Sequence, residues 1–494
     1  MKRADRDRFP HPILLSLAAA VVAGAALAGG GEPLERRQSF DADPGWDGRN
    51  NRSTLPPRTI VQDFGYSRTS HTGGEPGELG GVVTPSGEPA YYAREIEPRS
   101  LNDELTASGV FVGEGRNFNV LVGFFNAGTL NEWRTPSSLA LRLYGRGDNF
   151  YTYVEYCTRK WRAGADSPQG FMVRNPATGR TDPIEFPAGK NVYRWTLRYD
   201  PNANEGRGSI FATIGDRTAR CDLDPGHKQD GATFNRFGLL NVVKSADGGG
   251  EVWLDDLTVN GETERFDRDP RWDARRNRQI YASKEVRFRF DFGWSRTGHA
   301  GGTRTGEIGG LLYRGDGRDE DRIAYYADRV GPLTLQRPIR AAGRISFHRG
   351  VSDSTTLFGF FHSTETTKVD TAQATGFPDP FLGVALEGPS SEGFLLYPAV
   401  RIRGDHQEAS RAEQPNRIYP DGTSHSWSLE YTPGAPGQDG QMTVRLDGNS
   451  VTQAVPADFI ARGKLLDRFG FITTRVDGNA QVVYLDDLVY TAVQ

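Results

Sequence analysis

The chain has 494 residues, and its 59 Lys and Arg stand against 63 Asp and Glu, a formal net charge of −4. This balance, with no basic helix or Lys cluster, argues against nucleic acid as a partner. Glycine is abundant (60 residues) and aromatic residues make up 11 %, which favours many short strands joined by turns over a helical bundle. The length fits two domains better than one.

The first 28 residues have the features of a secretory signal peptide. Lys2 and Arg3 begin a basic start, Ile13–Ala28 is an apolar, Ala-rich run, and Ala26-Leu27-Ala28 is a small-residue cleavage site. The alternative is an uncleaved anchor, but a span needs about 20 strongly apolar residues. We therefore predict a secreted, extracytoplasmic protein that loses residues 1–28, with a linker at 29–37 and no membrane span after cleavage.

Two copies of one module make up the rest of the chain. The string FGYSRTSHTGGEPGELGG at 64–81 returns as FGWSRTGHAGGTRTGEIGG at 292–310. A similar opening segment precedes each motif, at 40–47 and 266–273. A similar closing segment ends each module, at 252–257 and 483–488. This internal repeat predicts a first domain at 38–262 and a second at 263–494, joined so closely that they should touch.

Alternating polar and apolar residues predict strands in both modules. Arg287–Phe292 alternates polar and aromatic side chains, the period of a half-buried strand. Tyr193–Tyr199 places its large side chains on one face, and Trp427, Leu429 and Tyr431 repeat that face. Beyond one or two turns at Pro456–Ala461 we find no convincing amphipathic helix. The expected fold class is all-β, with two tandem antiparallel β-sandwich domains of jelly-roll type.

The module endings carry a resemblance to a known superfamily. A strand that closes with Asp-Asp-Leu, at 255–257 and 486–488, together with an early acidic segment containing Trp, resembles the concanavalin A-like lectin/glucanase superfamily, which includes laminin-G-like modules. The resemblance implies two curved sheets whose concave face often binds glycans. It also implies a structural calcium ion near the chain ends.

Acidic residues in the openings and endings could hold that calcium. Because adjacent strand residues point to opposite faces, one Asp of each closing pair should face inward, where a carboxylate needs a partner or a cation. The alternative is that these carboxylates accept hydrogen bonds from the backbone or from Arg52 and Arg278. The candidate metal ligands are Asp41, Asp43, Asp255, Asp256, Asp267, Asp269, Asp486 and Asp487.

The repeated motif offers one candidate catalytic set, Arg68, His71, Glu78 and Tyr91. His, Arg and Tyr together would suit β-elimination on a uronate, and Glu78 with Asp63 would suit glycoside hydrolysis. The second copy has one extra residue between its Gly pair and Glu307. A shared turn-and-strand scaffold tolerates that change better than a shared mechanism does, so scaffold, ligand binding and catalysis all stay open.

A second hypothesis places a ligand-binding site on the strand around residues 151–157. Aromatic, guanidinium and carboxylate groups suit sugar stacking and hydroxyl recognition, although outward aromatics can simply cover a sheet. The candidate ligand-binding residues, including two from the second copy of the motif, are Arg142, Tyr151, Tyr153, Glu155, Arg159, Trp161, His299 and Glu307.

Cys157 and Cys221, the two cysteines of the chain, both lie in the first module. Their joint absence from the second module and an oxidising destination favour a disulfide. Two buried thiols are the alternative.

The function we expect is therefore binding of a polysaccharide or glycan by a secreted protein of two laminin-G-like modules. The first alternative is a polysaccharide-degrading enzyme, a lyase or glycoside hydrolase, with its site in the first module. The second alternative is a structural envelope protein.

Overall fold

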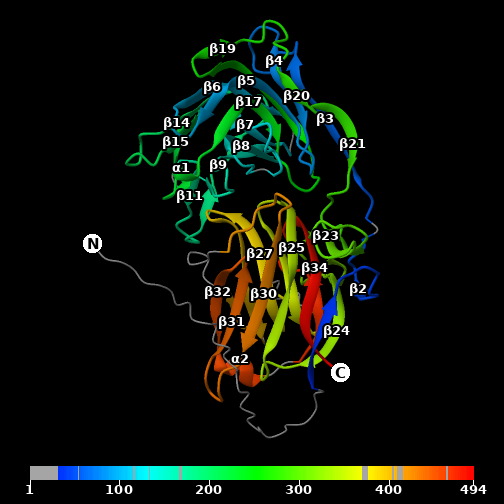
Figure 1. The fold of residues 1–494 in the computed structure, drawn as a ribbon. Helices are drawn as coiled ribbons and strands as arrows, with labels where there is room; N and C mark the ends of the chain where they lie inside the picture. Colours follow the sequence, from blue (N-terminus) through cyan, green and yellow to red (C-terminus); the bar gives the residue numbers. More distant parts are fainter. Residues whose placement is uncertain are drawn as a thin grey trace, which may run out of the picture.

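The computed structural model describes residues 32–53, 55–114, 117–132, 134–165, 170–369, 376–402, 405–408, 416–462 and 465–494, so the predicted signal peptide lies outside it. The described chain forms two β-sandwich units, one above the other in Figure 1. This confirms the predicted fold class. None of the helices within the described ranges has the length and apolar character needed to cross a membrane.

Unit one, the upper unit in Figure 1, consists of two antiparallel sheets and a separate hairpin. Sheet I contains, in spatial order, β16 (Arg217–Asp222), β15 (Ser209–Ile214), β14 (Tyr193–Asp200), β6 (Leu105–Glu114), β18 (Gly250–Val259), β4 (Glu78–Val83), β3 (Arg58–Ser67) and β21 (Arg278–Ser283), with β19 (Glu262–Glu264) beside β18. Sheet II contains β10 (Ala163–Ala165), β9 (Asn149–Cys157), β8 (Ser138–Arg146), β7 (Asn119–Phe125), β17 (Thr233–Asn241), β5 (Tyr91–Ser100) and β20 (Asp273–Arg275), with β13 (Phe186–Pro187) beside β9. The hairpin pairs β11 (Met172–Arg174) with β12 (Thr181–Pro183).

Unit two repeats this design. Sheet III contains β22 (Asp291–Ser295), β23 (Glu307–Tyr313), β34 (Ala480–Val493), β25 (Ile339–Gly350), β30 (Ser424–Thr432), β31 (Gly440–Leu446) and β32 (Asn449–Val455), with β1 (Pro33–Gln38) beside β34. Sheet IV contains β2 (Asp47–Arg49), β24 (Tyr325–Leu333), β33 (Leu466–Ile472), β26 (Ser354–Phe361), β27 (Phe381–Ser390), β28 (Gly393–Ile402) and β29 (Asp405–Glu408). The described helices are short: α1 (His227–Asp230), α2 (Ala457–Arg462) and the 3₁₀ turn η1 (Glu320–Arg322).

Each unit has its own apolar core between its two sheets. In β14 every second side chain enters that core, so Trp195, Leu197 and Tyr199 are buried while the residues between them face water. Trp427, Leu429 and Tyr431 do the same in β30, as predicted. The predicted strand at Arg287–Phe292 is wrong over most of its length: β22 starts at Asp291. The amide of Arg289 donates to the carbonyl of Val286, so this linking segment turns there instead of extending.

The opening segments of the two modules are exchanged between the units. β1 pairs with β34 and β2 with β24, so residues 33–49 complete unit two, and Phe40 and Trp46 enter its core. Conversely, β20 pairs with β5 and β21 with β3, and Phe266 enters the core of unit one. Strand pairs therefore cross the predicted boundary at 262/263 in both directions. Pro33–Gln38, expected to belong to a linker, forms a strand.

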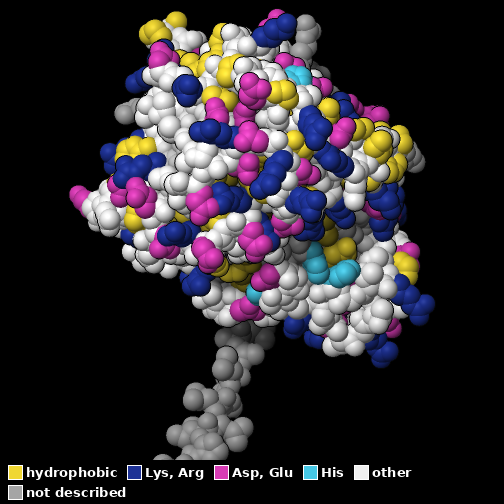
Figure 2. All heavy atoms as spheres, turned by 90° about the horizontal axis from the view of Figure 1, so that it is seen from above, with side chains coloured by type: hydrophobic (Ala, Val, Ile, Leu, Met, Phe, Trp, Pro, Cys, Tyr) yellow, Lys and Arg dark blue, Asp and Glu magenta, His cyan; other side chains and the backbone are white. Residues whose placement is uncertain are grey.

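Charged side chains are mixed on the outside of the molecule. Seen from above unit one, Figure 2 shows Lys and Arg interspersed with Asp and Glu, without a large area of one sign on the face in view. Such a face does not present the continuous basic stripe that a nucleic-acid backbone requires.

Candidate functional site

The outer face of sheet II, on strands β7, β8 and β9, gathers polar and aromatic side chains. Because successive strand residues alternate, Leu139, Leu141 and Leu143 enter the core and the residues between them point outward. In the strand register Arg142 lies directly opposite Tyr153, and Ala140 opposite Glu155. We call the following outward set the polar face: Asn119, Arg142, Tyr144, Tyr151, Tyr153 and Glu155.

Arg142 is the centre of the polar face. Its Nε donates to Oδ1 of Asn119 at 3.1 Å, and its Nη1 lies 3.5 Å from Oε1 of Glu155. The guanidinium carbon lies 5.7 Å from the ring centre of Tyr144 and 5.8 Å from that of Tyr153. The cation is thus held between two aromatic rings and one carboxylate. Three of the predicted ligand-binding residues, Arg142, Tyr153 and Glu155, are brought together here.

A loop between β7 and β8 adds two charged side chains to this neighbourhood. Arg134 lies 3.7 Å from Oε1 of Glu155. Glu132, only 1 % exposed, accepts a hydrogen bond from the Ser352 amide of unit two at 3.1 Å. Burial raises the pKa of Glu132 to about 8, and the nearby Glu155 carboxylate adds to the rise while Arg134 opposes it. At neutral pH Glu132 is therefore mostly protonated.

Several buried polar atoms around Arg142 have no hydrogen-bond partner among the described residues. They are Nδ2 of Asn119, Oε1 of Glu132, Nε of Arg134 and Oε2 of Glu155. Asn119 is 1 % exposed and Glu155 5 %, so their surroundings are protein on most sides. Buried polar groups in native proteins nearly always have partners, because each orphan costs about 1–3 kcal/mol.

Tyr151, Arg159 and Trp161 lie apart from that centre. The Tyr151 hydroxyl donates to Oε1 of Glu185 at 2.9 Å, and that hydrogen bond raises the pKa of Tyr151. Arg159 is exposed. Trp161 stacks on Tyr419 of unit two, with ring centres 5.5 Å apart. Trp161 therefore belongs to the contact between the units and not to the polar face.

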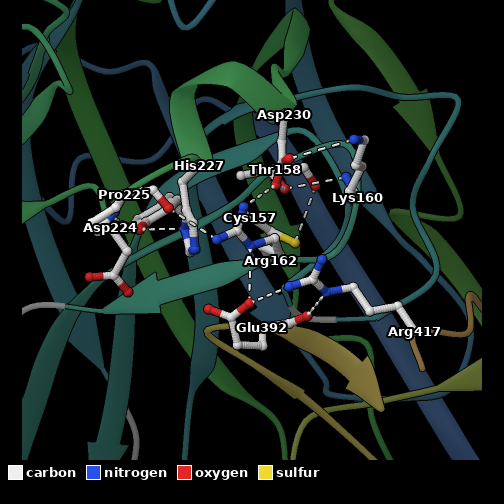
Figure 3. Close-up of polar contacts among 11 residues, drawn as sticks. Cys157, Thr158, Lys160, Arg162, Asp224, Pro225, His227, Asp230, Glu392 and Arg417 are labelled. Carbon is white, nitrogen blue, oxygen red and sulfur yellow. Dashed lines mark hydrogen bonds and ion pairs between the residues drawn. The ribbon is translucent and has the colours of Figure 1, made fainter. Parts of the chain in front are cut away.

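Figure 3 shows the polar contacts beside Trp161, at the same junction. Arg162 of unit one lies 3.2 Å from Asp230 and 3.6 Å from Glu392 of unit two. Arg417 contacts the same Glu392 carboxylate at 2.5 Å. Arg162 and Glu392 are both half-buried. Their ion pair therefore contributes to the contact between the two units.

The predicted catalytic residues are not brought together. Glu78 is fully buried and accepts hydrogen bonds from the amides of His71 and Thr72 and from the Thr72 hydroxyl. His71 stacks on Trp253 at 4.1 Å and contacts Glu114 at 3.2 Å. These residues lie on sheet I. Tyr91 lies on sheet II and donates to Asp273, and Arg68 is exposed.

The second copy of the motif has the same construction. Glu307 is fully buried and accepts hydrogen bonds from the amides of His299 and Ala300 and from the Thr297 hydroxyl. The extra residue of this copy lies after the amides that bind Glu307. The insertion therefore does not disturb the hydrogen bonds between the carboxylate and its loop. His299 packs on Tyr484, with ring centres 4.4 Å apart. In both units the buried Glu organises a loop.

The closing Asp pairs form bulges with one carboxylate inside. Asp255 and Asp486 are buried. The residues after them, Asp256 and Asp487, have positive φ angles of 51° and 47°, and the register of the strand pairing shifts at this point. Burial raises the pKa of Asp255 to about 6 and that of Asp486 to about 7, and neighbouring carboxylates add to both rises. A Cβ on Gly302 would collide with the Asp486 carboxylate, so this loop needs glycine.

The remaining candidate metal ligands do not complete a cation site. Asp41, Asp43, Asp267 and Asp269 are exposed, and Asp269 accepts a hydrogen bond from Tyr92. Within the described ranges no group of three or more His, Cys, Asp or Glu side chains could hold a metal ion. Because calcium also takes backbone carbonyl ligands, this finding does not test the ion, and calcium stays a prediction.

The predicted disulfide is not formed. Cys157 and Cys221 are both buried as reduced cysteines. Cys221 enters the core of unit one beside Tyr156, whereas Cys157, the next residue along β9, must point to the opposite face. Burial raises the pKa of the Cys157 thiol, which keeps it protonated and unreactive.

Sequence reasoning missed Asn119, Glu132, Arg134 and Tyr144. Asn119 and Tyr144 could have been found, because they lie at the outward positions of strands whose inward positions are apolar. Glu132 and Arg134 lie in a loop, where no periodic pattern assigns a direction to a side chain.

A hollow of about 460 Å³ lies elsewhere, on the outside of unit two. Its floor is apolar, with Ala341, Ala342 and Val489, and Glu35 and Arg340 lie at its rim. It shares no residue with the polar face.

Comparison with known proteins gives no family assignment: no family model and no curated protein matches the chain. Among solved structures it is similar to domains LG4-5 of the mouse laminin α1 chain (10 % identity, 87 % of this chain and 91 % of that chain, TM-score 0.22). It is also similar to peanut lectin (12 %, 41 % and 90 %, TM-score 0.26) and to an alginate lyase of Pseudomonas aeruginosa (12 %, 46 % and 97 %, TM-score 0.24). At such TM-scores the likenesses carry no argument, and the β-sandwich class rests on the chain's own sheets.

Proposed function

We propose that the protein is an extracytoplasmic carbohydrate-binding protein that holds a saccharide on the polar face of unit one. The observation that carries this proposal is the grouping of Asn119, Glu155 and two tyrosine rings around the Arg142 guanidinium on the outer face of sheet II. A sugar hydroxyl both donates and accepts, so neighbouring hydroxyls of one ring can satisfy an amide, a guanidinium and a carboxylate together.

The aromatic residues of the polar face support the same ligand class. Tyr144 and Tyr153 flank Arg142, and both are partly exposed. The apolar face of a pyranose can pack on such rings while its hydroxyls reach the charged groups between them. The cluster thus combines stacking surface and hydrogen-bonding groups within the reach of one or two sugar rings.

Unit two suggests the sharpest test of this proposal. In the strand register, the positions of Arg142 and Glu155 are occupied by Ala385 and Ala399 in unit two. The double variant R142A/E155A therefore gives unit one a pattern that the same fold already accommodates, and it removes both charges of this ion pair together, so that Arg134 alone loses a contact with Glu155. We expect saccharide affinity on a glycan array and by calorimetry to fall at least about tenfold, the loss of roughly one charged hydrogen bond.

The matched control is R198A/E104A. This variant removes an Arg–Glu pair of the same unit, 2.7 Å apart and half-exposed, on sheet I. It should bind as the unaltered protein does. If the unaltered protein binds no polysaccharide on the array, or if R142A/E155A binds as tightly, the proposal fails.

A second candidate function, polysaccharide degradation, is favoured by one observation. Glu132 and Glu155 lie near each other, with the pKa of Glu132 raised to about 8 and an unpartnered oxygen on each carboxyl group. Neighbouring carboxyl groups, one of which has a raised pKa, can supply a general acid at neutral pH. Product release from a polysaccharide, abolished in E132Q but not in E132D, would support it, whereas binding without products would favour the first candidate.

Export and calcium belong to the proposal as untested parts. Export predicts a mature N-terminus at Gly29, which N-terminal sequencing of the exported protein reads directly. Calcium predicts a melting temperature that falls in EDTA and recovers with Ca²⁺ but not with Mg²⁺. An unchanged melting temperature would contradict the calcium prediction without affecting the sugar site.

A further inference from the structure

The outermost strand of sheet I, β21, has an unusual edge. It pairs with β3 on one side, and no described residue pairs with it on the other. Ile280, at its centre, is 73 % exposed, more than any other large hydrophobic side chain within the described ranges. Val61 lies directly opposite it on β3 and is 39 % exposed. Figure 2 shows hydrophobic side chains gathered at its right margin, the side on which β21 lies in Figure 1.

The backbone register fixes which groups of β21 point away from β3. Asn277 accepts a hydrogen bond from the amide of Phe64 opposite it, so Asn277 belongs to a hydrogen-bonded pair. In an antiparallel ladder such pairs alternate along the strand. Gln279 and Tyr281 therefore bond to β3, whereas Arg278, Ile280 and Ala282 direct their N–H and C=O groups outward. The free edge thus has three donors and three acceptors in a row.

The segment of unit two that corresponds to β21 has a different sequence, which does not suit pairing with a further strand. After the matching Asn51-Arg52 the chain continues to Pro56-Pro57, at the positions of Ala282 and Ser283. Proline lacks the N–H group that a neighbouring strand would need. In unit two the described residues of this segment, 51–53 and 55–57, make a single bridge, from Arg52 to Asp291. One copy of the repeat therefore protects this edge and the other leaves it open and apolar.

We propose that β21 is a dimerisation edge that pairs antiparallel with β21 of a second copy of this chain. Side chains directly opposite each other must share a face, and the register that places Ile280 against Ile280 of the second copy satisfies this condition. Arg278 then lies opposite Ala282 of the second copy, so no two cations meet at the centre. Ile280 and Val61 of both copies form one continuous apolar cluster on the outside of the joined sheets.

This register favours a second copy over an unrelated strand as the occupant. All three outward-pointing residues exchange both backbone hydrogen bonds with the second copy, and the two-fold axis passes between the Ile280 residues. An edge of six residues is a small interface, so we expect a dimer that dissociates on dilution.

The test is sedimentation velocity of the chain from residue 29 across a wide concentration range. The unaltered protein should shift from monomer to dimer as concentration rises. I280K should raise the dimer dissociation constant at least about tenfold, because two lysines would meet at the two-fold axis. The matched control V192K replaces another exposed apolar side chain (44 % exposed) and should dimerise as the unaltered protein does.

Cross-linking tests the register itself. In I280C the two thiols meet at the axis and should form an intermolecular disulfide under mild oxidation. In Q279C the two thiols are offset by two residues along the strands, beyond the reach of a disulfide, and should not cross-link. The native cysteines are buried and should not compete. A protein that is monomeric at every concentration, or a dimer that I280K leaves intact, overturns the proposal. Equal cross-linking of I280C and Q279C overturns the register, and capture of an unrelated peptide strand by a monomeric protein would make that strand the occupant instead.

Discussion

Units one and two share a scaffold but differ on the outer face of one sheet. Where β8 and β9 place Arg142 and Glu155, strands β27 and β28 of unit two place Ala385 and Ala399, and Leu395 takes the position of Tyr151. The face in unit two is an apolar cluster, to which Phe377 contributes from outside the strands. Glu78 and Glu307 each accept hydrogen bonds from two backbone amides and one threonine hydroxyl of their own loop. The repeated motif therefore builds the frame, and the difference between the units lies on strands that the motif does not include.

The largest expected effect concerns the exchange of opening segments between the two units. Trp46, in the first half of the sequence, packs on Phe40, Tyr326 and Tyr490 in the core of unit two. W46A should destabilise unit two by about 3–5 kcal/mol and leave unit one unchanged. W272A should do the reverse, with a smaller loss because Trp272 is only partly buried. Calorimetry that resolves two transitions checks this, and a Trp46 effect confined to unit one would contradict the exchange.

The next effect concerns pH and a residue of unit one at its contact with unit two. The pKa of Glu132 rises from 4.5 to about 8 on burial, so its contribution to stability is fully present below about pH 4.5 and is lost as pH rises to 8. This loss is on the order of 5 kcal/mol, because each unit of pKa change corresponds to about 1.4 kcal/mol. Urea unfolding at several pH values should show a shallower decline in E132Q than in the unaltered protein. The control is Glu365→Gln, a surface residue, which should leave the slope unchanged.

A smaller effect should be equal in the two units. Glu78→Gln and Glu307→Gln each replace a buried carboxylate that holds two backbone amides, so each should cost about 1–3 kcal/mol. Saccharide binding should survive both changes. If E78Q abolished binding or turnover while E307Q did not, the motif of unit one would be a ligand site as well as a frame.

The smallest effect is expected for the two motif histidines. His71 and His299 rest on Trp253 and Tyr484 on the outer face of their sheets and are not central to a core. H71A and H299A should each change stability by less than about 1 kcal/mol and leave binding intact. Loss of activity in H71A alone would restore the catalytic hypothesis for this motif.

Sequence reasoning reached the fold because alternation and repetition are direct consequences of two-sided sheets. It could not tell whether the segment around Trp46 opens its own module or closes another, because a repeat can be cut at any point of its period. It placed Arg142, Tyr153 and Glu155 in one site from residue type and strand spacing. It predicted a disulfide that strand alternation forbids, since Tyr156 and not Cys157 faces the core of unit one. Glu132 gave no signal, because its environment is made by Ser352 of the other unit.

The pairing of β1 with β34 also sets an order in time. Pro33 lies opposite Val493, 460 residues later (493 minus 33), so the first strand to leave the ribosome or a translocon must wait for the last. Unit one receives its closing strand β21 at residues 278–283, soon after its other strands exist. Unit one can therefore finish folding while unit two is still being made, and unit two becomes complete only when the entire chain has emerged. An incomplete chain would carry one finished sandwich and an N-terminal strand without its sheet.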